Sequence, residues 1–507
     1  PALNYKRGEA VIAGQRTGTA EQAGYPKQCV TALPVVDHDP VAGTREDLLG
    51  FDPWRYVKPG KPVLAESLGA VQRAAELGVR LPFAVDTHCL AYPLQVRNIT
   101  FPNRLGIAPM EGADSTPEGA PSAYTVRRYV NEAIGGSAVI WFEAISIVEE
   151  GRSSQTQLLL TRDTLDEFKK MTAAVKEAGL KANGYAPYLI MQANHSGRYS
   201  NPGNKPAPMI AYRHPILEQY RAADDSCIVS DDYLKGLEVK FGEAAALAKE
   251  AGFDAVDIKS CHGYLLAELA SAYNRPGEYG GSFENRFRLL KNGIRAAKVY
   301  EDDHFMVTAR LGIYDGYAYP WGFGVSPESG MTPDLTEPIR LVRDLHNELG
   351  LNMVNLTMGN PYATTHVTRP FDFGKYEPDE HPFVGLSRMI HGIGAVKKAV
   401  QEMTVWASAP TYLRAYADLF SAGAVEQGLC DGMLFGRMAF ADPDFANEIV
   451  KNGRIDPKRV CLTCGKCGDL IRAHKPTGCV IRDSKTFMPF YKEFLEIKKT
   501  QPANFRG

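Results

Sequence analysis

Short apolar runs alternate with helical segments along most of this chain of 507 residues. Each run is a few residues long and almost continuously apolar, which is typical of parallel strands that are buried on both faces. A chain that alternates in this way is expected to surround a parallel sheet with helices. We expect the strands at residues 104–110, 138–143, 188–192, 255–259, 305–311, 353–357, 405–408 and 432–435.

Helix signals occur between these runs. Residues 230–252 offer Ser230 or Asp231 as the N-cap, repeat apolar residues at helical spacing and end at Gly252. Residues 332–350 show the same pattern. Eight strands that alternate with helices over about 360 residues predict a (β/α)8 TIM barrel with insertions. The alternative, a doubly wound sheet, would want a G-x-G-x-x-G turn after an early strand, and the sequence has none.

The two ends of the chain do not follow the alternation. Residues 1–90 contain several prolines and one helical pattern, at residues 62–78, and we interpret them as an N-terminal extension that packs on the barrel. Residues 91–455 form the predicted barrel. Residues 456–507 hold a group of cysteines and a polar tail. We therefore expect one large domain with an attachment at each end.

The charge balance and the hydropathy pattern exclude two classes of partner. Lys and Arg number 57 and Asp and Glu 59, so the net charge is -2 and nothing indicates a nucleic acid or an anionic membrane. The most apolar window, residues 137–148, is broken by Glu143 and fits a buried strand better than a membrane span. The N-terminus lacks the apolar core of a signal peptide, so we expect a cytoplasmic protein, with a homo-oligomer as one option.

Four of the nine cysteines lie close together near the C-terminus. Disulfides, a structural zinc ion and an iron–sulfur cluster are the three explanations for such a group. A reducing cytoplasm disfavours disulfides, whereas C-x2-C spacing suits both zinc and iron–sulfur. The candidate metal ligands are Cys461, Cys464, Cys467 and Cys479.

Three titratable side chains follow the fourth predicted strand, where a barrel enzyme carries its chemistry. They are Lys259, His262 and Tyr264, all within six residues. A polar loop with a hydrogen-bonded histidine is the structural alternative. Three groups that can hold or move protons at one strand end make a catalytic site equally reasonable.

The fifth and eighth strands end in basic residues. Arg310 directs a permanent cation toward the barrel mouth, where it requires an anionic ligand or a salt bridge to a neighbouring strand. Gly436 and Arg437 stand before a helix, a combination that suits a phosphate, although an ordinary β-to-α turn has the same pattern.

Several longer motifs occur in a fixed order along the chain. The strongest is VDIKSCHGYLLAELASAYNRPGEYGGSFENRFR at residues 256–288. The others are FPNRLGIAPM (101–110), LIMQANHSGRYS (189–200) and DGMLFGRMAFADPDF (431–445). Together they resemble the old yellow enzyme family, in particular its iron–sulfur branch, which includes 2,4-dienoyl-CoA reductase and trimethylamine dehydrogenase. The resemblance covers about residues 91–485 and places CLTCGKC-x11-C where that branch binds a 4Fe-4S cluster.

The resemblance implies that FMN binds across the barrel mouth. The matching residues are Pro109, Met110, Gln192, Arg310, Ala407, Ser408, Gly436 and Arg437. The first two match the turn that lies along the flavin, and the glutamine matches the residue that bonds the pyrimidine edge. Arg310 matches the cation that stabilises the anionic reduced ring, and Gly436 and Arg437 match the phosphate site. Ala407 and Ser408 stand where the family usually has a glycine-containing phosphate loop, and we expect them to supply backbone amides instead.

The resemblance also implies roles for the groups after the fourth strand. Tyr264 matches the proton donor of the family, and His262 matches the residue that holds the substrate carbonyl oxygen. Lys259 departs from the residue usual in its position and suggests an anionic or carbonyl substrate. Glu111 departs as well, because that position is often Thr or Cys, and covalent attachment of the flavin is not expected.

A second proton-handling residue is expected after the sixth strand if the chain is similar to 2,4-dienoyl-CoA reductases. Those enzymes have a histidine there, and in this sequence only Tyr362 and His366 could serve.

The cluster implies transfer of single electrons, and the sequence ends soon after its cysteines. We therefore expect an external electron partner, either a flavoprotein, ferredoxin or NAD(P)H. The predicted activity is an ene-reductase that transfers hydride from FMN N5 to a carbonyl-conjugated C=C bond of a small-molecule substrate. Two alternatives are an amine or N-methyl dehydrogenase that passes electrons out through the cluster, and a non-catalytic barrel with a structural metal site.

Overall fold

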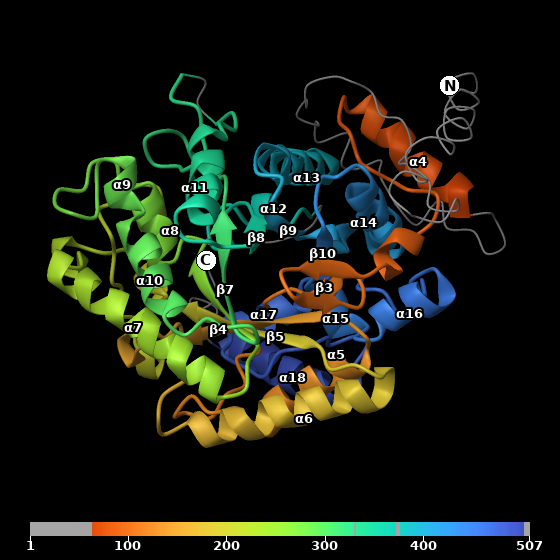
Figure 1. Ribbon diagram of the computed structural model, residues 1–507, viewed down its shortest axis with the longest axis horizontal. Coiled ribbons are helices and arrows are strands. Elements are labelled where there is room, and N and C mark those ends of the chain that lie inside the picture. Colours follow the sequence, from red (N-terminus) through yellow and green to blue (C-terminus); the bar gives the residue numbers. More distant parts are fainter. Residues whose placement is uncertain (1–62, 329–330, 372–375, 501–507) are drawn as a thin grey trace.

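Eight parallel strands form a closed barrel at the centre of the molecule (Figure 1). The computed structural model describes residues 63–328, 331–371 and 376–500. The barrel strands are β3 (Leu105–Ile107), β4 (Val139–Ser146), β5 (Tyr188–Asn194), β6 (Ala255–Ser260), β7 (Met306–Gly312), β8 (Met353–Thr357), β9 (Thr404–Ala407) and β10 (Gly432–Phe435). Each predicted run overlaps one of them, β10 closes against β3, and the (β/α)8 prediction is confirmed.

Helices follow or precede the strands and surround the barrel. The α-helices are α4 (Val63–Glu76), α5 (Ala123–Ile134), α6 (Leu165–Asn183), α7 (Asp231–Glu250), α8 (Leu265–Ala270), α9 (Phe283–Arg286), α10 (Arg288–Lys298), α11 (Thr336–Asn347), α12 (Thr365–Thr368), α13 (Pro382–Ala399), α14 (Ala417–Glu426), α15 (Arg437–Ala441), α16 (Phe445–Asn452), α17 (Lys466–Arg472) and α18 (Ser484–Thr500). Short 3-10 turns are η2 (His88–Ala91), η3 (Glu149–Gly151), η4 (Gly197–Tyr199), η5 (Pro202–Asn204), η6 (Leu217–Gln219), η7 (Asp225–Cys227) and η8 (Pro410–Tyr416). None of the helices in the described ranges combines the length and the apolar character that crossing a lipid bilayer requires.

Local sequence explains where the predicted helices begin and end. The Ser230 side chain accepts a hydrogen bond from the N–H of Tyr233 and caps α7, so Ser230 rather than Asp231 is the N-cap. Gly252 has φ +85°, which stops this helix in a left-handed turn. The second predicted helix, α11, starts at Thr336, later than the pattern suggested.

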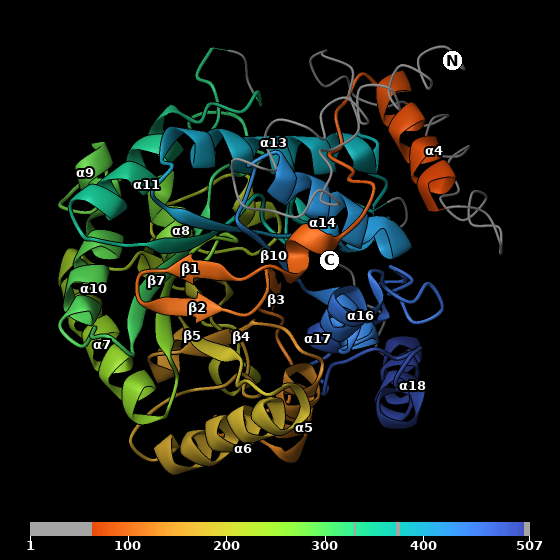
Figure 2. The same cartoon turned by 45° about the vertical axis from the view of Figure 1, so that its right-hand side comes forward.

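Alternate residues of the strands point into the barrel and fill its amino-terminal half with apolar side chains. This inner cluster includes Trp141, Ile190, Ala255, Met306, Met353, Trp406 and Leu434. A hairpin that the sequence did not predict, β1 (Leu94–Val96) with β2 (Ile99–Phe101), packs on the same cluster (Figure 2). Its Phe101 ring meets the Trp406 ring edge to face at 5.9 Å, so the hairpin closes this end of the barrel.

On the same strands, the next residues that point into the barrel, toward the carboxyl ends, are polar. Asp257 accepts hydrogen bonds from Trp141 Nε1 at 2.7 Å and from Gln192 Nε2 at 2.6 Å. Asn355 donates to Ser408 Oγ at 3.0 Å. The barrel interior therefore changes from apolar to hydrogen-bonded toward the carboxyl ends of the strands.

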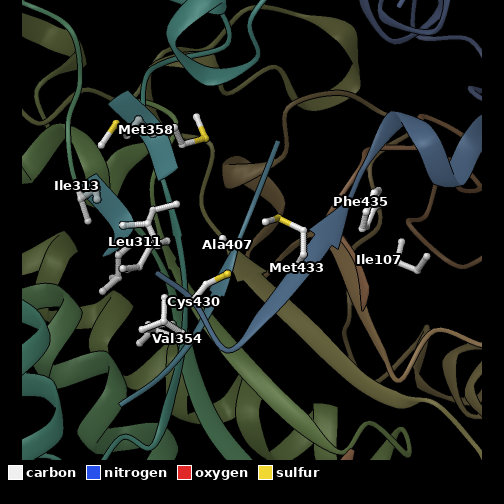
Figure 3. Packing of buried hydrophobic residues seen from close by; sticks show 14 of the residues in the cluster. Ile107, Leu311, Ile313, Val354, Met358, Ala407, Cys430, Met433 and Phe435 are labelled. Atoms are coloured by element: carbon white, nitrogen blue, oxygen red, sulfur yellow. The ribbon is translucent and has the colours of Figure 1, made fainter. Parts of the chain in front are cut away.

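The other face of each strand packs against the helices. Figure 3 shows part of this outer layer, with Val354, Ala407, Met433 and Phe435 from three strands among the labelled side chains. All four are fully or almost fully buried. This layer holds the strand ends, and the side chains on them, in fixed positions.

Parts of both terminal regions lie within the described residues. The helix predicted at residues 62–78 is present as α4, and the rest of the predicted extension up to residue 62 lies outside the described ranges. The C-terminal helices α17 and α18 form a small core of Leu470, Val480, Phe487, Tyr491 and Phe494. Helix α18 lies beside α5 (Figure 2), where the Phe490 and Tyr124 rings meet edge to face at 5.5 Å.

Candidate active site

Lys259, near the end of β6, and His262 and Tyr264, in the turn that follows it, lie at the carboxyl end of the barrel. The Lys259 Nζ atom lies 3.9 Å from the centre of the Tyr264 ring, which is a cation–π distance. Both side chains are buried, with exposed fractions of 5% and 4%. His262 stands between them in the chain, and its Nε2 atom is buried without a hydrogen-bond partner among the described residues.

The turn after β6 depends on two left-handed residues. His262 has φ +67° and Gly263 has φ +70°. A Cβ atom on Gly263 would lie 2.0 Å from Nδ2 of Asn360, so only glycine fits. The strained turn lifts the His262 and Tyr264 side chains onto the barrel mouth, as is common for functional loops.

The Tyr264 hydroxyl has two partners from other loops. It donates to Oε1 of Glu111 at 3.0 Å, and it lies 2.8 Å from the hydroxyl of Tyr362. The Tyr362 ring stacks on Tyr199 with centroids 3.7 Å apart. Of the two residues considered after the sixth strand, Tyr362 reaches Tyr264, whereas His366 instead bonds Tyr376 through Nδ1 at 2.8 Å.

Burial decides the charge of these groups. It lowers the pKa of Lys259 to about 8 and, together with Arg310 and Lys259, lowers the pKa of His262 well below its usual value. His262 is therefore a neutral imidazole. Burial, followed by the Glu111 charge, holds the pKa of Tyr264 well above its usual value. The site thus presents a titratable ammonium, a neutral imidazole and an un-ionised phenol.

Arg310 is the neighbour of Lys259 on the next strand, in register across β6 and β7. Its side chain is 5% exposed, and its Nε atom has no hydrogen-bond partner among the described residues. Asp257 accepts from the backbone N–H of Arg310, not from its guanidinium. A salt bridge to a neighbouring strand, one of the two explanations for this residue, is not formed in the described residues. An anionic ligand is the other explanation.

Gln192 and Asp257 form a pair just below the mouth. The carboxylate of Asp257 fixes the glutamine amide and receives the indole N–H of Trp141. Burial raises the pKa of Asp257 to about 6, and these hydrogen bonds oppose the rise. Gln192 is 1% exposed and held at one orientation.

The remaining predicted flavin-binding residues gather where β3, β9 and β10 end side by side. Pro109 and Met110 lie just after β3. The Met110 sulfur packs close to Gly436, since it would be 3.1 Å from a Cβ atom placed on that glycine. The other predicted flavin-binding residues here lie at the ends of β9 and β10: Ala407 ends β9, Ser408 and Gly436 follow the two strands, and Arg437 begins α15. Arg437 is 8% exposed, and its Nη1 atom lacks a hydrogen-bond partner among the described residues.

The loop that carries Glu111 is anchored by a buried ion-pair network. Arg128 Nη2 donates to Glu143 Oε1 at 2.6 Å and to both oxygens of Asp114 at 3.2 Å. The other Glu143 oxygen accepts from the N–H of Gly112 at 2.8 Å. Burial raises the pKa of Glu143 to about 7, and Arg128 opposes this. The network fixes the backbone next to Glu111.

The four cysteines of the C-terminal segment line one cavity, together with Arg437, Phe440 and Lys466. Backbone amides point at two of the sulfur atoms: Thr463 N–H donates to Cys461 at 3.4 Å and Arg482 N–H to Cys479 at 3.3 Å. All four cysteines are free thiols in this structure, and no disulfide joins them. Burial raises the pKa of the Cys461 thiol, and Arg437 opposes that rise.

All four cysteines line the same cavity. Among the residues that the structure describes, no group of three or more His, Cys, Asp or Glu side chains has the arrangement of a single-ion site. A zinc ion would need its sulfur ligands about 2.3 Å from one centre. An iron–sulfur cluster binds each thiolate through a different iron atom, so its ligands need not meet at one centre.

Several residues of the site were missed or only noted by sequence reasoning. Asp257 was missed because it lies within a strand and not in a loop. A single carboxylate inside an apolar strand could have indicated a functional residue. Glu111 and Tyr362 were noted, but their contact with Tyr264 joins loops more than ninety positions apart in the chain. Tyr199 and Asn360 gave no signal, because both act by supporting other residues.

Comparison with known proteins adds the family. Residues 90–322 match the NADH:flavin oxidoreductase / NADH oxidase family. An NADPH dehydrogenase of Bacillus velezensis is 33% identical over 220 residues, which cover 42% of this chain and 61% of that protein. The chain thus spans about three fifths of the length of that relative. The predicted resemblance to the old yellow enzyme family is confirmed.

Two solved structures share the fold. A 2-naphthoyl-CoA reductase in complex with 2-naphthoyl-CoA superposes with a TM-score of 0.64 at 18% identity, covering 80% of this chain and 58% of that one. An old yellow enzyme homologue from Zymomonas mobilis superposes with a TM-score of 0.54 at 20% identity, covering 72% of this chain and 94% of that one. At these identities the likeness supports the barrel architecture.

Proposed function

Because residues 90–322 match the NADH:flavin oxidoreductase / NADH oxidase family, we propose that this chain is a flavin-dependent oxidoreductase that reduces an activated C=C bond. The observation that carries the proposal is the convergence of Lys259, His262 and Tyr264 beside the unpaired Arg310 at the barrel mouth. Carboxyl ends of barrel strands are where such enzymes hold their chemistry.

The residues at the mouth fit FMN. Arg310 and Arg437 each keep a buried nitrogen without a partner in the described residues, which suits two anionic parts of a ligand. Arg310 would face the reduced ring and Arg437 the phosphate. Gln192, oriented by Asp257, would bond the pyrimidine edge. Pro109, Met110, Ala407, Ser408 and Gly436 complete the proposed binding set.

The C-terminal cavity fits a 4Fe-4S cluster bound by Cys461, Cys464, Cys467 and Cys479. The support is the single cavity that they share and the backbone N–H groups that donate to two of the sulfur atoms. A cluster would supply single electrons from an external donor such as a flavoprotein or ferredoxin, while NAD(P)H would deliver hydride to the flavin directly.

Bound FMN supplies the hydride, and the protein side chains prepare the substrate. His262, neutral and without a partner at Nε2 in the described residues, would hydrogen-bond the substrate carbonyl oxygen. Lys259, when protonated, would add positive charge at the same oxygen. Tyr264 would donate a proton to the α-carbon as the β-carbon receives the hydride.

An anaerobic screen tests the proposal. The purified protein is reduced with dithionite, and its flavin absorbance is followed after addition of enones, unsaturated thioesters or saturated amines. We expect enones or unsaturated thioesters to reoxidise the flavin. Reduction of the oxidised protein by amines, with no response to alkenes, would favour the amine dehydrogenase alternative. A colourless protein without iron or flavin would support the non-catalytic one.

A further inference from the structure

We propose that Arg221 is a specificity-determining residue, which binds an anionic group that the substrate carries at the end far from its reacting C=C bond. The role rests on the proposed function and defines a substrate class within it, namely enones or unsaturated thioesters that bear a carboxylate or a phosphate. Arg221 belongs to the segment between β5 and α7, residues 195–230, and lies outside the groups that the reaction itself uses.

Packing holds this segment beside the loop that follows β8. Leu217 lies in a buried apolar cluster with Tyr317 and Ala363, and Ala363 is the chain neighbour of Tyr362. The backbone N–H of Arg221 donates to the carbonyl oxygen of Leu217 at 2.9 Å, one turn earlier in the chain. These contacts bring the main chain of Arg221 close to the loop that carries Tyr362.

The carbonyl oxygen of Arg221 is held by a buried arginine. Arg198 Nη1 donates to it at 3.4 Å, and Arg198 is itself fixed by an ion pair with Glu268 and a hydrogen bond to the carbonyl oxygen of Tyr212. Arg221 therefore starts from a fixed main chain, and its side chain is only partly exposed. A binding group that is ordered beforehand loses less conformational entropy when a ligand arrives.

The guanidinium of Arg221 lacks a counter-ion. Within the described ranges no carboxylate pairs with it, and its Nε atom is buried without a hydrogen-bond partner there. Burial lowers the pKa of Arg221, and the groups that oppose this are the phenols of Tyr362 and Tyr199. Arginine nevertheless keeps its charge at neutral pH. A partly buried cation in these surroundings suits an anion that comes from outside the chain.

Tyrosine rings connect Arg221 to the proposed reaction centre. The Tyr264 hydroxyl lies 2.8 Å from that of Tyr362, whose ring stacks on Tyr199 with the centroids 3.7 Å apart. Arg221 acts electrostatically on both Tyr362 and Tyr199. Tyr362 is 40% exposed, so this aromatic wall extends from the buried Tyr264 to the surface. A substrate with its reacting carbon at Tyr264 would pass along Tyr362 and reach Arg221 with its far end.

The cysteine segment contributes a further neighbour of Arg221. Burial, followed by the Arg221 charge, lowers the pKa of His474, which stands just after α17. His474 is therefore a neutral imidazole at neutral pH, and such a ring can donate one hydrogen bond to an anion. The segment that holds the four cysteines thus borders the proposed anion subsite.

The test compares para-carboxybenzylideneacetone with its methyl ester on the flavin-loaded protein. The two enones share the reacting bond and differ by one negative charge. Calorimetry on the oxidised protein measures affinity without turnover, and stopped flow on the reduced protein measures flavin reoxidation. We expect wild type to bind the acid roughly 10- to 100-fold more tightly than the ester, the range for hydrogen bonds to a charged group.

A second pair of probes identifies the preferred anion. The phosphate ester of para-hydroxybenzylideneacetone is compared with the uncharged phenol in the same two measurements. A preference for either anion over its neutral counterpart supports the role of Arg221, and the larger of the two preferences shows whether a carboxylate or a phosphate fits better.

Three variants separate this role from a structural one. Arg221→Gln should abolish the preference for the acid and leave the affinity and reoxidation rate of the methyl ester unchanged. Arg221→Lys keeps the charge and should restore part of the preference. Lys205→Gln is the matched control, because it removes an exposed cation from the same segment, and it should keep the full preference.

The outcomes that overturn the role differ from those that overturn the function. Equal affinity of wild type for acid and ester, or an undiminished preference in Arg221→Gln, overturns the role and leaves the reductase assignment standing. A loss of equal size for acid and ester in Arg221→Gln shows that Arg221 only supports the fold, and it also overturns the role. Failure of every enone to reoxidise reduced wild type overturns the reductase assignment.

Discussion

The backbone N–H of Thr477 donates to the carbonyl oxygen of Gly112 at 2.7 Å. Thr477 lies two positions before Cys479, and Gly112 follows Glu111, so one hydrogen bond joins the cysteine segment to the loop that contacts the Tyr264 hydroxyl. The cysteine cavity and the barrel mouth also share Arg437, which lines the first and borders the second. The two proposed cofactor sites are therefore neighbours in space, although they are far apart in the chain.

Cys464→Ser should remove the iron and leave FMN bound. Cys464 is the one exposed cysteine of the four, so its loss should disturb the barrel least. We expect wild type to contain about one FMN, released by acid, and four irons per chain if a 4Fe-4S cluster is bound. Iron and flavin analysis after anaerobic purification measures both.

The matched control for this change is Cys227→Ser, a cysteine outside the cluster segment, which should keep wild-type iron and flavin. Zinc in place of iron in anaerobic wild type would contradict the cluster assignment. Unchanged turnover of Cys464→Ser with a one-electron donor would mean that the cluster takes no part in electron transfer.

Lys259→Met should weaken binding of an anionic or enolate-like inhibitor by roughly 10- to 100-fold, or about 1.4–2.8 kcal/mol. In wild type the affinity should fall as the pH rises through about 8, because the ammonium form of Lys259 is the one that binds and burial lowers its pKa to about 8. The Lys259→Arg variant should bind the inhibitor at all of these pH values. Titration of the flavin absorbance with the inhibitor, repeated across this pH range, measures the affinity. If the affinity of Lys259→Met falls with pH in the same way, the pH dependence belongs to another group.

The sequence predicted the barrel and the residues that adjacent positions bring together. Lys259, His262 and Tyr264 lie within six positions, so a strand-end motif was sufficient to propose them. Continuous apolar runs likewise placed each of the eight strands, because a strand that is buried on both faces is apolar at almost every position. The hairpin of β1 and β2 was missed, since strands of three residues are too short to show a period.

Contacts between distant loops were not predictable in this way. The distance from Tyr264 to Glu111 depends on how the barrel closes and on the left-handed turn at His262 and Gly263, and no local pattern encodes either. Arg369 is a similar case. It follows the short α12, yet its pKa responds to Arg437, Cys467 and Arg472, which belong to the C-terminal part of the chain.

Arg369→Gln should lower the reduction potential of a bound cluster. Burial lowers the pKa of Arg369 to about 10, so it remains a cation at neutral pH beside Cys467, and a nearby cation favours the more negative reduced cluster. We expect a shift of about 59 mV, a tenfold change for a one-electron couple. Redox titration followed by electron paramagnetic resonance gives the value.

Arg472→Gln is the control, because Arg472 is paired with Asp469 and more exposed, so its charge is already compensated. An equal shift in both variants, or none in Arg369→Gln, would contradict a specific effect of Arg369.

Gly263→Ala should destabilise the protein more than Gly184→Ala. Both glycines have positive φ, which costs alanine about 1–2 kcal/mol. A Cβ atom at Gly184 meets nothing within 4 Å, whereas one at Gly263 lies 2.0 Å from Asn360 Nδ2. Thermal unfolding should therefore show a lower midpoint for Gly263→Ala, and adding Asn360→Ala should recover part of the difference. Equal midpoints for the two single variants would show that the Asn360 contact is not restrictive.

Tyr264→Phe tests the proposed donor itself. The ring and its contact with Lys259 remain, so folding and FMN content should be unchanged. Loss of the hydroxyl should slow reoxidation of reduced flavin by an enone roughly 10²–10⁴-fold, the usual range for general acid catalysis. Reduction of the flavin should keep its rate, because that half-reaction does not use this proton. Stopped-flow absorbance resolves the two half-reactions. If Tyr264 only shapes the site, substrate affinity will weaken while the rate at saturation stays near wild type, and that pattern would leave His262 or Lys259 as the acid.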